Sequence, residues 1–175
     1  MPPSDDDLLS LRSCISLVRL FHQRIKAPIA ATPRTLKCDS ASALIYSHRV
    51  AALAKEAADA ANGTTDLLLS RLAMTLEEIG EWLAAHANGD VPSAADALGD
   101  RLYLLLGDAV ATGLPLCEIF EAVHQSNLSK LPGVTTGLGK GVKGTDYQRP
   151  DLATLLATLT AERTPDESDY LLDEI

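Results

Sequence analysis

Long segments of helical periodicity, separated by helix-stop signals, run through this 175-residue chain as far as Lys130. Within each segment apolar residues recur three and four positions apart, which is the pattern of an amphipathic helix. Asn62-Gly63 and Asn88-Gly89 interrupt the pattern, as Asn and Gly do where a helix ends. No alternating run is long enough to predict a strand. The sequence therefore predicts an all-α fold, a bundle of about five helices.

Capping residues and prolines set the boundaries of the predicted helices. Ser4 is expected to cap the first helix, because three aspartates follow it and negative charge stabilises a first helical turn. The length favours one domain, which we place at residues 1–163. The acidic residues 164–175 have a composition typical of disorder. The predicted helices cover residues 4–26, 42–61, 65–88, 92–112, 116–130 and, as a short last one, 152–163.

Charge and composition argue against several classes of protein. The net charge is −9, which disfavours a nucleic-acid surface. No apolar run reaches the ~18 residues that a membrane span needs, and the N-terminus lacks the basic residues of a signal peptide. Three widely spaced cysteines form neither a disulfide framework nor a zinc motif. We expect a cytoplasmic protein that binds neither nucleic acid nor a membrane.

Three glutamates lie close together in the stretch LEEIGEWL, at Glu77, Glu78 and Glu81. Like charges at this spacing repel by a few tenths of a kcal/mol per pair. They fall on the side of the predicted helix opposite its leucine stripe. Taken alone, this helix favours a solvated face; the other interpretation is a set of ligands held by a cation.

The next predicted helix changes this balance. Asp100 lies in the middle of an otherwise apolar side, and an unpaired buried carboxylate is expensive. If the two helices form an antiparallel hairpin, Asp100 can face Glu78 and Glu81. Such all-oxygen ligands suit Mg²⁺ or Mn²⁺ rather than zinc. The alternative is a salt bridge from Asp100 to Arg71 or Arg101.

The same helix, 92–112, is apolar on nearly every side, as a buried helix is. Gly107 within it costs about 1 kcal/mol relative to Ala, which makes sense if another group approaches the backbone there. Leu104, Ala111 and Leu114 need more cover than one protomer offers. We therefore expect a homodimer with two-fold symmetry, whose partner chain contributes to the site.

Polar and basic side chains occupy the last long helix and the glycine-rich loop after it. The stretch VHQSNLSK places His124 and Asn127 one turn apart, with Lys130 one turn further, and a histidine such as His124 is more typical of packing than of ligation. The loop lacks the GxxxxGK[ST] spacing of a P-loop, although a helix end and a basic loop can bind phosphate. The loop contributes Lys140, Lys143, Tyr147 and Arg149.

Three stretches form a recognisable pattern: EEIGE, DALGDRLYLLLGDAVATGLPLCEIFEAVHQSNLSKL and GKGVKGTDYQRPDL. Together they resemble the all-α nucleoside triphosphate pyrophosphohydrolases, a superfamily that includes MazG-like proteins, dimeric dUTPases and phosphoribosyl-ATP pyrophosphohydrolases. Its motif is two glutamates, a third acid after a two-residue gap, and an acid pair ending in Asp on the next helix. The resemblance covers about residues 71–152. It implies Mg²⁺-dependent cleavage of a nucleoside triphosphate into a monophosphate and pyrophosphate, by a dimer or a dimer of dimers.

The resemblance also implies a role for each matching residue. Glu77 is expected to act as the base for the attacking water. Glu78, Glu81 and Asp100 are expected to bind the metal between two antiparallel helices. The expected substrate-binding residues are Asn127, Lys130, Lys143, Tyr147 and Arg149.

The chain departs from the family pattern in two places. Ala97 stands where many members carry an acid, and Asp96 beside it points about 100° away, so that it is a poor substitute. The segment 38–65 looks like an additional helix. A non-catalytic nucleotide-binding or regulatory protein therefore stays an alternative, as does a structural helical protein with solvated acids. Mg²⁺-dependent release of pyrophosphate separates these hypotheses.

Overall fold

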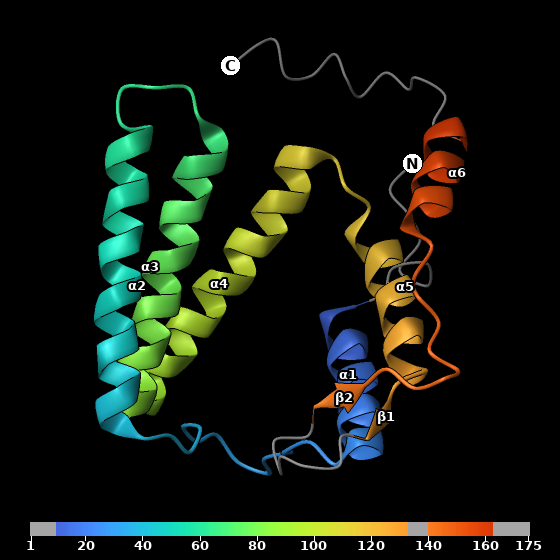
Figure 1. Cartoon of the computed structure of the whole chain (residues 1–175), viewed down its shortest axis with the longest axis horizontal. Helices are drawn as coiled ribbons and strands as arrows, with labels where there is room; N and C mark the ends of the chain where they lie inside the picture. Colours follow the sequence, from blue (N-terminus) through green and yellow to red (C-terminus); the bar gives the residue numbers. More distant parts are fainter. Residues whose placement is uncertain (1–9, 133–139, 163–175) are drawn as a thin grey trace. The chain divides into compact units, whose positions relative to one another are not determined.

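The computed structural model describes residues 10–132 and 140–162. Helices make up nearly all the regular structure in these ranges, and one pair of two-residue strands makes up the rest (Figure 1). The predicted all-α fold is therefore confirmed. The elements in chain order are α1 (Leu11–Ile25), α2 (Ser40–Ala61), α3 (Leu67–Asn88), α4 (Val91–Thr112), α5 (Leu116–Leu128), β1 (Leu131–Pro132), β2 (Gly141–Val142) and α6 (Leu152–Glu162).

The chain divides into two compact units, and each is described by itself. Unit 1 combines Met1–Ile29 with Pro115–Ile175, and unit 2 is Ala30–Leu114. Unit 2 holds α2, α3 and α4. The single domain expected over residues 1–163 stays a prediction, and the acidic tail 164–175 lies outside the described residues.

Capping explains where the helices of unit 2 begin and end. Asp66 and Asp90 each accept a hydrogen bond, at 2.9 and 3.0 Å, from the backbone N–H three residues further on. Each bond satisfies a donor that the first turn leaves without a partner. Gly89 and Gly113 end α3 and α4 with φ of 70° and 66°, a left-handed conformation that glycine adopts without strain. The ends of α3 and α4 agree with the predicted stop signals.

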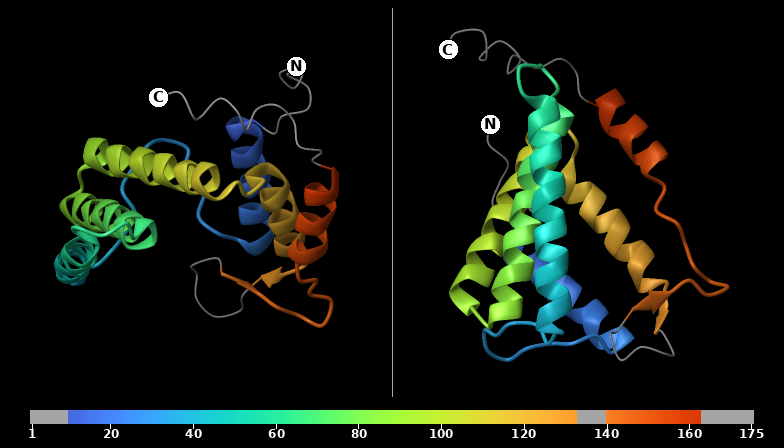
Figure 2. Two further views of the ribbon diagram at one scale, coloured as in Figure 1. Left: turned by 90° about the horizontal axis from the view of Figure 1, so that it is seen from above. Right: turned by 60° about the vertical axis from the view of Figure 1, so that its left-hand side comes forward.

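Small residues form the interface between α2 and α3, which run side by side (Figure 2). A Cβ added at Gly80 would lie 3.5 Å from the carbonyl oxygen of Ser47. The Ser47 hydroxyl donates to the Gly80 carbonyl at 2.8 Å. The closest packing in unit 2 therefore depends on small side chains rather than on leucine. The buried alanines of these two helices are Ala43, Ala54, Ala57, Ala61, Ala73 and Ala85.

α4 is more exposed than its sequence predicts. Tyr103 and Val110 are 79% and 85% exposed, and Leu98 and Leu105 are 58% and 52% exposed. Asp100 lies at an exposed position as well. Within unit 2 only α3 packs extensively against α4, so much of its apolar surface is uncovered, and the predicted cover by a partner chain stays a prediction.

In unit 1, α1 packs on α5. Ser10 caps α1 by accepting a hydrogen bond from the backbone N–H of Ser13 at 3.1 Å, and the predicted cap Ser4 lies outside the described residues. On α5, His124 is buried and stacks on Phe120 with ring centroids 6.1 Å apart. This contact makes His124 a packing residue.

A short antiparallel ladder follows α5. Leu131 lies opposite Val142, and Pro132 lies opposite Gly141. The sequence did not predict these strands, because two residues are too few to show alternation. The ladder closes the glycine-rich segment whose residues 133–139 lie outside the described ranges.

No single helix in the described ranges is long and apolar enough to cross a membrane. α4 and α5, which are separated by a break, reach the length and composition of a membrane span only when their residues are combined.

Candidate active site

Glu78 is the central residue of a gathering of acids on α3 and α4. Its side chain is half-buried, whereas Glu77 and Glu81 are exposed. The Oε2 atom of Glu78 is buried and has no hydrogen-bond partner in the part of the chain that the structure describes. A buried carboxylate oxygen without a donor costs free energy, so this atom is suited to a proton or a bound cation.

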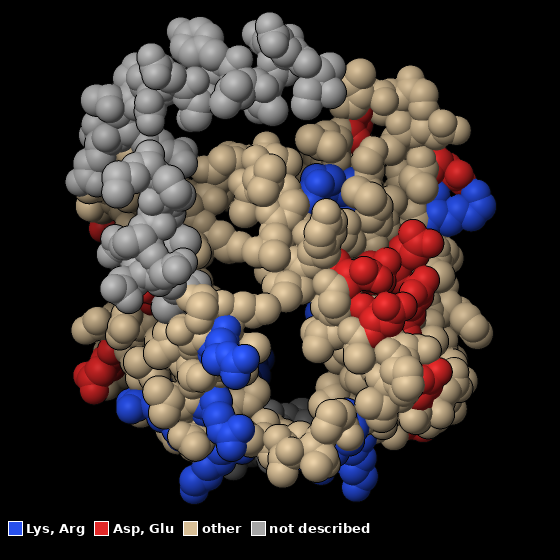
Figure 3. Space-filling model, turned by 180° about the vertical axis from the view of Figure 1, so that it is seen from behind, with Lys and Arg blue, Asp and Glu red and all other residues tan. Residues whose placement is uncertain are grey.

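Burial raises the pKa of the Glu78 carboxyl, and four neighbouring carboxylates raise it further. In decreasing order of effect they belong to Glu81, Asp100, Glu77 and Asp96. We call these five residues the acidic group. Acidic side chains gather on one face of unit 2 in the space-filling view (Figure 3). The structure thus brings Asp100 near the three glutamates, while the roles of these residues stay predictions.

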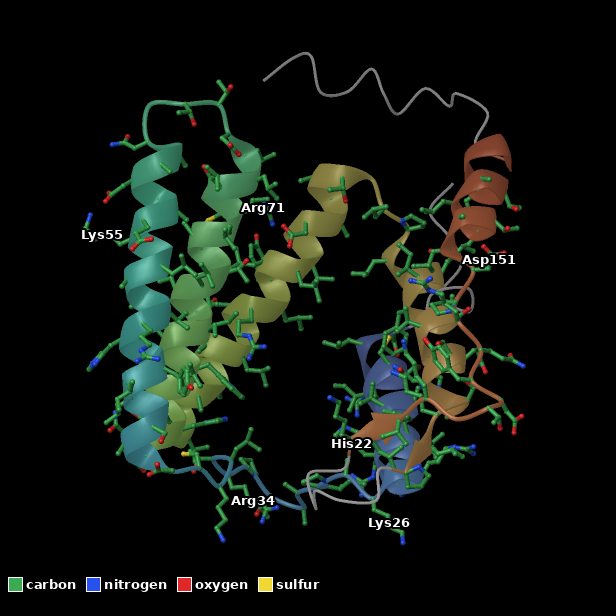
Figure 4. The ribbon with its side chains drawn as sticks, viewed as in Figure 1. His22, Lys26, Arg34, Lys55, Arg71 and Asp151 are labelled. Atoms are coloured by element: carbon green, nitrogen blue, oxygen red, sulfur yellow. The ribbon has the colours of Figure 1, made fainter. Side chains whose placement is uncertain are left out.

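Asp100 forms no ion pair with any residue in the described ranges. Arg71 pairs instead with Asp108, across from α3 to α4 (Figure 4). Arg101 lies over the ring of Trp82, with its guanidinium carbon 5.0 Å from the ring centroid. Both arginines that could have neutralised Asp100 are engaged elsewhere, so the salt-bridge alternative is wrong.

Gly107 allows Arg71 to approach the backbone of α4. A Cβ at this position would lie only 2.8 Å from Nη2 of Arg71. The same nitrogen donates to the carbonyl of Leu104 at 2.8 Å. The predicted close approach at Gly107 is confirmed, and the approaching group is a guanidinium. Arg71 thus ties α3 to α4 about two turns from Glu78.

Ala97 is 1% exposed, so the acid that many family members carry there would be buried in this chain. Asp96 is exposed, yet its charge acts on the pKa of Glu78. Asp96 and Asp100 lie four residues apart and share a face of α4. Asp96 does not take the position of Ala97, but it adds a charge to the acidic group that the sequence pattern did not lead us to expect.

The acidic group contains carboxylate oxygens of the kind that bind divalent cations, but these oxygens are not arranged around a common point. Within residues 10–132 and 140–162, no three His, Cys, Asp or Glu side chains are placed to hold a metal ion. The donor set nevertheless fits Mg²⁺, because it consists of carboxylate oxygens and includes the unpartnered Oε2 of Glu78. The exposed members can turn toward a common ion, since exposed side chains change rotamer within nanoseconds.

The second set of predicted site residues lies in unit 1, around Tyr147. Lys143 places its Nζ atom 4.8 Å from the centroid of the Tyr147 ring. The pKa of Tyr147 is lowered, first by the hydrogen bond with Ser126 and then by the positive charges of Lys143, Lys130 and Arg149. The structure therefore brings the three predicted phosphate-binding cations together.

Asn127 joins these residues through Lys130, whose Nζ donates to Asn127 Oδ1 at 2.6 Å. We call Asn127, Lys130, Lys143, Tyr147 and Arg149 the basic group. The acidic group belongs to unit 2 and the basic group to unit 1.

Two serines missed by the sequence analysis hold the loop against α5. Ser126 donates to the carbonyl of Gln148 at 2.7 Å, and the backbone N–H of Gln148 donates to Ser129 Oγ at 2.9 Å. The only sequence signal was a pair of hydroxyls one turn apart at the end of a helix. Their partner in the loop could not be read from the sequence, because that contact joins residues about twenty positions apart.

Comparison with known proteins finds a similarity that includes the acidic group. Residues 48–127 match the family model of phosphoribosyl-ATP pyrophosphohydrolase. The fold is similar to a crystal structure from Exiguobacterium sp. 255-15, a protein provisionally assigned as an NTP pyrophosphohydrolase, with 20% identity, a TM-score of 0.51, and coverage of 86% of this chain and 98% of that chain. A comparison with curated proteins finds no match. The matched residues and the similar fold agree with the resemblance to the all-α nucleoside triphosphate pyrophosphohydrolases.

Proposed function

We propose that the protein is a Mg²⁺-dependent nucleoside triphosphate pyrophosphohydrolase. It cleaves its substrate between the α and β phosphates and releases a nucleoside monophosphate and pyrophosphate. The observation that carries this proposal is the buried, unpartnered Oε2 of Glu78 within a gathering of five carboxylates. The family match over residues 48–127 supports the class of reaction.

Glu78, Glu81 and Asp100 would hold Mg²⁺ or Mn²⁺, with Asp96 adding negative charge nearby. A bound ion would supply positive charge to offset the negative charge that develops on the phosphate groups. No described residue bonds to any of these carboxylates, so their oxygens are free to serve as ligands.

Glu77 is the proposed general base. Its carboxylate is exposed, so water reaches it. It accepts the proton of the attacking water, whose oxygen bonds to phosphorus. The bridging oxygen between the α and β phosphates leaves with the pyrophosphate, which balances the reaction as a hydrolysis.

We assign the basic group to binding the phosphate chain of the substrate. In a dimer, this group comes either from the protomer that holds the acidic group or from its partner. Lys130, Lys143 and Arg149 donate charge-assisted hydrogen bonds to phosphate oxygens, and Asn127 contacts sugar or phosphate. Lys143 already covers the ring of Tyr147. We therefore assign Tyr147 to closing the loop rather than to stacking on a base.

The active form is proposed to be a homodimer, or a dimer of such dimers. The apolar side chains exposed on α4, above all Tyr103 and Val110, form the kind of surface that marks an interface. We expect an interface above ~2,000 Å² in total, in the obligate class. Sedimentation at micromolar concentration should show the dimer, and a fully active monomer of 18.6 kDa would contradict it.

A cytoplasmic location is part of the proposal. All three cysteines are free, as is usual in a reducing compartment. Burial, and then the nearby thiol of Cys117, raise the pKa of Cys14. Cys14 therefore stays a protonated thiol at neutral pH.

One observation favours a second candidate, a nucleotide-binding protein without turnover. Ala97 removes an acid that many family members carry, and its burial leaves no room for a nearby side chain to take the same position. This candidate predicts that nucleotides raise the melting temperature without being hydrolysed.

A panel of nucleoside triphosphates, assayed for pyrophosphate release, tests the proposal. We expect release that depends on Mg²⁺, stops with EDTA and disappears in Glu77→Gln. Nucleotide-induced stabilisation without release would select the second candidate. Absence of both effects with every triphosphate would overturn the proposed function.

A further inference from the structure

A groove between α2 and α3 opens beside the acidic group and has no role in the function described so far. Two hollows form it, with volumes of about 390 and 590 Å³. The two hollows share Ala58, Ala73 and Glu77 in their linings, so Glu77 lies where they meet. Glu81 lines the first hollow, and Asn62 and Ser70 line the second.

We propose that this groove receives the nucleoside part of the substrate, with the α phosphate at Glu77 and the base near Asn62 and Ser70. The proposal rests on the proposed function, because Glu77 and Glu81 mark the phosphate end only if they belong to the active site. It gives α2, most of which lies within the matched residues 48–127 rather than outside the family region as expected, a role as one wall of the substrate site.

The dimensions of the groove fit this occupant. Volumes of about 300–1,000 Å³ are usual for small-molecule sites, and each hollow falls within that range. Along α3, Ser70 lies seven residues before Glu77, or about 10 Å at the rise of an α-helix. That is the length scale of a nucleoside extended from its α phosphate.

The second hollow also offers the chemistry that a nucleobase needs. The Asn62 side-chain amide makes no hydrogen bond with the residues that the structure describes, so its donors and its acceptor are available. Met74, 39% exposed, lines the same hollow and offers a polarizable apolar surface for a flat ring. Asp59 is already paired with Lys55 at 2.7 Å, so Asn62 is the residue that can discriminate between bases.

Small side chains on α2 keep the groove open. Ala51, Ala54 and Ala58 line it, and each would fill part of it if enlarged. Ala58 is exposed and lies at the junction of both hollows, whereas Ala60, also exposed on α2, lines neither. This pair supplies a test variant and a matched control.

The experiment compares Ala58→Leu with Ala60→Leu in the full chain. KM and kcat are measured with the preferred triphosphate, and binding of the product monophosphate is measured by calorimetry. We expect Ala58→Leu to raise KM and weaken monophosphate binding by at least about tenfold, the scale on which added methylenes act in a filled site. Ala60→Leu should match the wild type in both measurements.

The outcomes separate this inference from the function on which it rests. If the wild type hydrolyses a triphosphate and the two variants behave alike, the groove is not the nucleoside site and the proposed function stands. If the wild type hydrolyses none, the proposed function fails first. A shift in oligomeric state confined to Ala58→Leu would also overturn the inference, because it would show that a second copy occupies the groove.

Asn62→Ala is the second variant, placed at the exposed end of α2 where folding is least affected. It should change the ratio of kcat/KM between purine and pyrimidine triphosphates by at least about tenfold, since an amide that pairs with a base edge discriminates on this scale. An unchanged ratio, with Ala58→Leu impaired, would move the base out of the second hollow and overturn the proposed orientation.

Discussion

The acidic and the basic group differ in how the chain itself satisfies their charges. In the basic group, Lys130 bonds to Asn127 and Lys143 covers Tyr147, so the loop is assembled by its own contacts. In the acidic group, none of the five carboxylates has a hydrogen bond or ion pair with a described residue. Contacts within the chain therefore already position the side chains of the basic group. We propose that a cation from outside the chain completes the acidic group.

The largest effect is expected at Glu77. Changing Glu77 to Gln removes the proposed base, so kcat for pyrophosphate release should fall by roughly 10²–10⁴-fold. The matched control is Glu56→Gln, a solvent-exposed acid on α2, which should leave kcat unchanged. If Glu77→Gln keeps kcat within a few-fold of the control, the base must be sought elsewhere in the acidic group.

The next effect concerns the basic group. Lys143→Ala and Arg149→Ala should each raise KM by about tenfold with a smaller change in kcat, because a charged hydrogen bond to phosphate contributes about 1.5–3 kcal/mol. Lys140→Ala is the control, since Lys140 belongs to the same loop but is absent from the charges that act on Tyr147. Equal KM values for all three variants would show that the basic group does not bind phosphate.

A third substitution tests whether Arg71 holds the acids of α3 and α4 together. Gly107→Ala places a Cβ against the Arg71 guanidinium, and overpacking of this kind costs about 1–3 kcal/mol of unfolding free energy. Gly99→Ala, in the same helix with nothing within 4 Å of the new Cβ, should stabilise the protein by up to about 1 kcal/mol. Urea denaturation of both variants measures the contrast. If Gly107→Ala has the same free energy of unfolding as the wild type, the Arg71 guanidinium can move away from the new Cβ without destabilising the protein.

The smallest effect is the one most specific to the acidic group. The pKa of Glu78 is raised in the folded state, so the folded protein holds this proton more tightly than the unfolded chain does. The resulting stabilisation is present below the unfolded pKa of about 4.3 and is lost as pH rises through the folded value. In EDTA, Glu78→Gln should therefore melt higher than the wild type at pH 8, and the difference should shrink toward pH 4.

Added Mg²⁺ gives the complementary result. It should raise the melting temperature of the wild type at pH 8, because it binds the folded state alone, and should act far less on Glu78→Gln. In EDTA, a wild type that melts at the same temperature as Glu78→Gln at pH 8 would show that the carboxylates do not repel one another.

The local parts of this structure could be predicted from sequence. The stop at Gly89 and the close approach at Gly107 follow from the conformational preferences of glycine. The grouping of Asp100 with the glutamates followed from a hairpin whose short connection left few alternatives.

The parts that could not be predicted depend on where loops and exposed side chains lie in three dimensions. Ser126 and Gln148 meet only because the loop returns to α5. Asp96 joins the acidic group although it does not occupy the expected position, and helix periodicity alone could not show that its charge reaches Glu78. The sequence indicated that one chain leaves part of α4 uncovered, but its composition did not reveal which side chains, such as Tyr103 and Val110, are the most exposed.

Titration with Mn²⁺, followed by the loss of the free-ion EPR signal, tests most directly whether the acidic group is a cation site. The wild type should bind Mn²⁺ saturably at neutral pH, and Mg²⁺ should displace it. Asp100→Asn should lose this binding while keeping its fold by circular dichroism, and Asp59→Asn, an acid already paired with Lys55, should keep it. Binding that persists in Asp100→Asn, or that is absent in the wild type, would contradict the account.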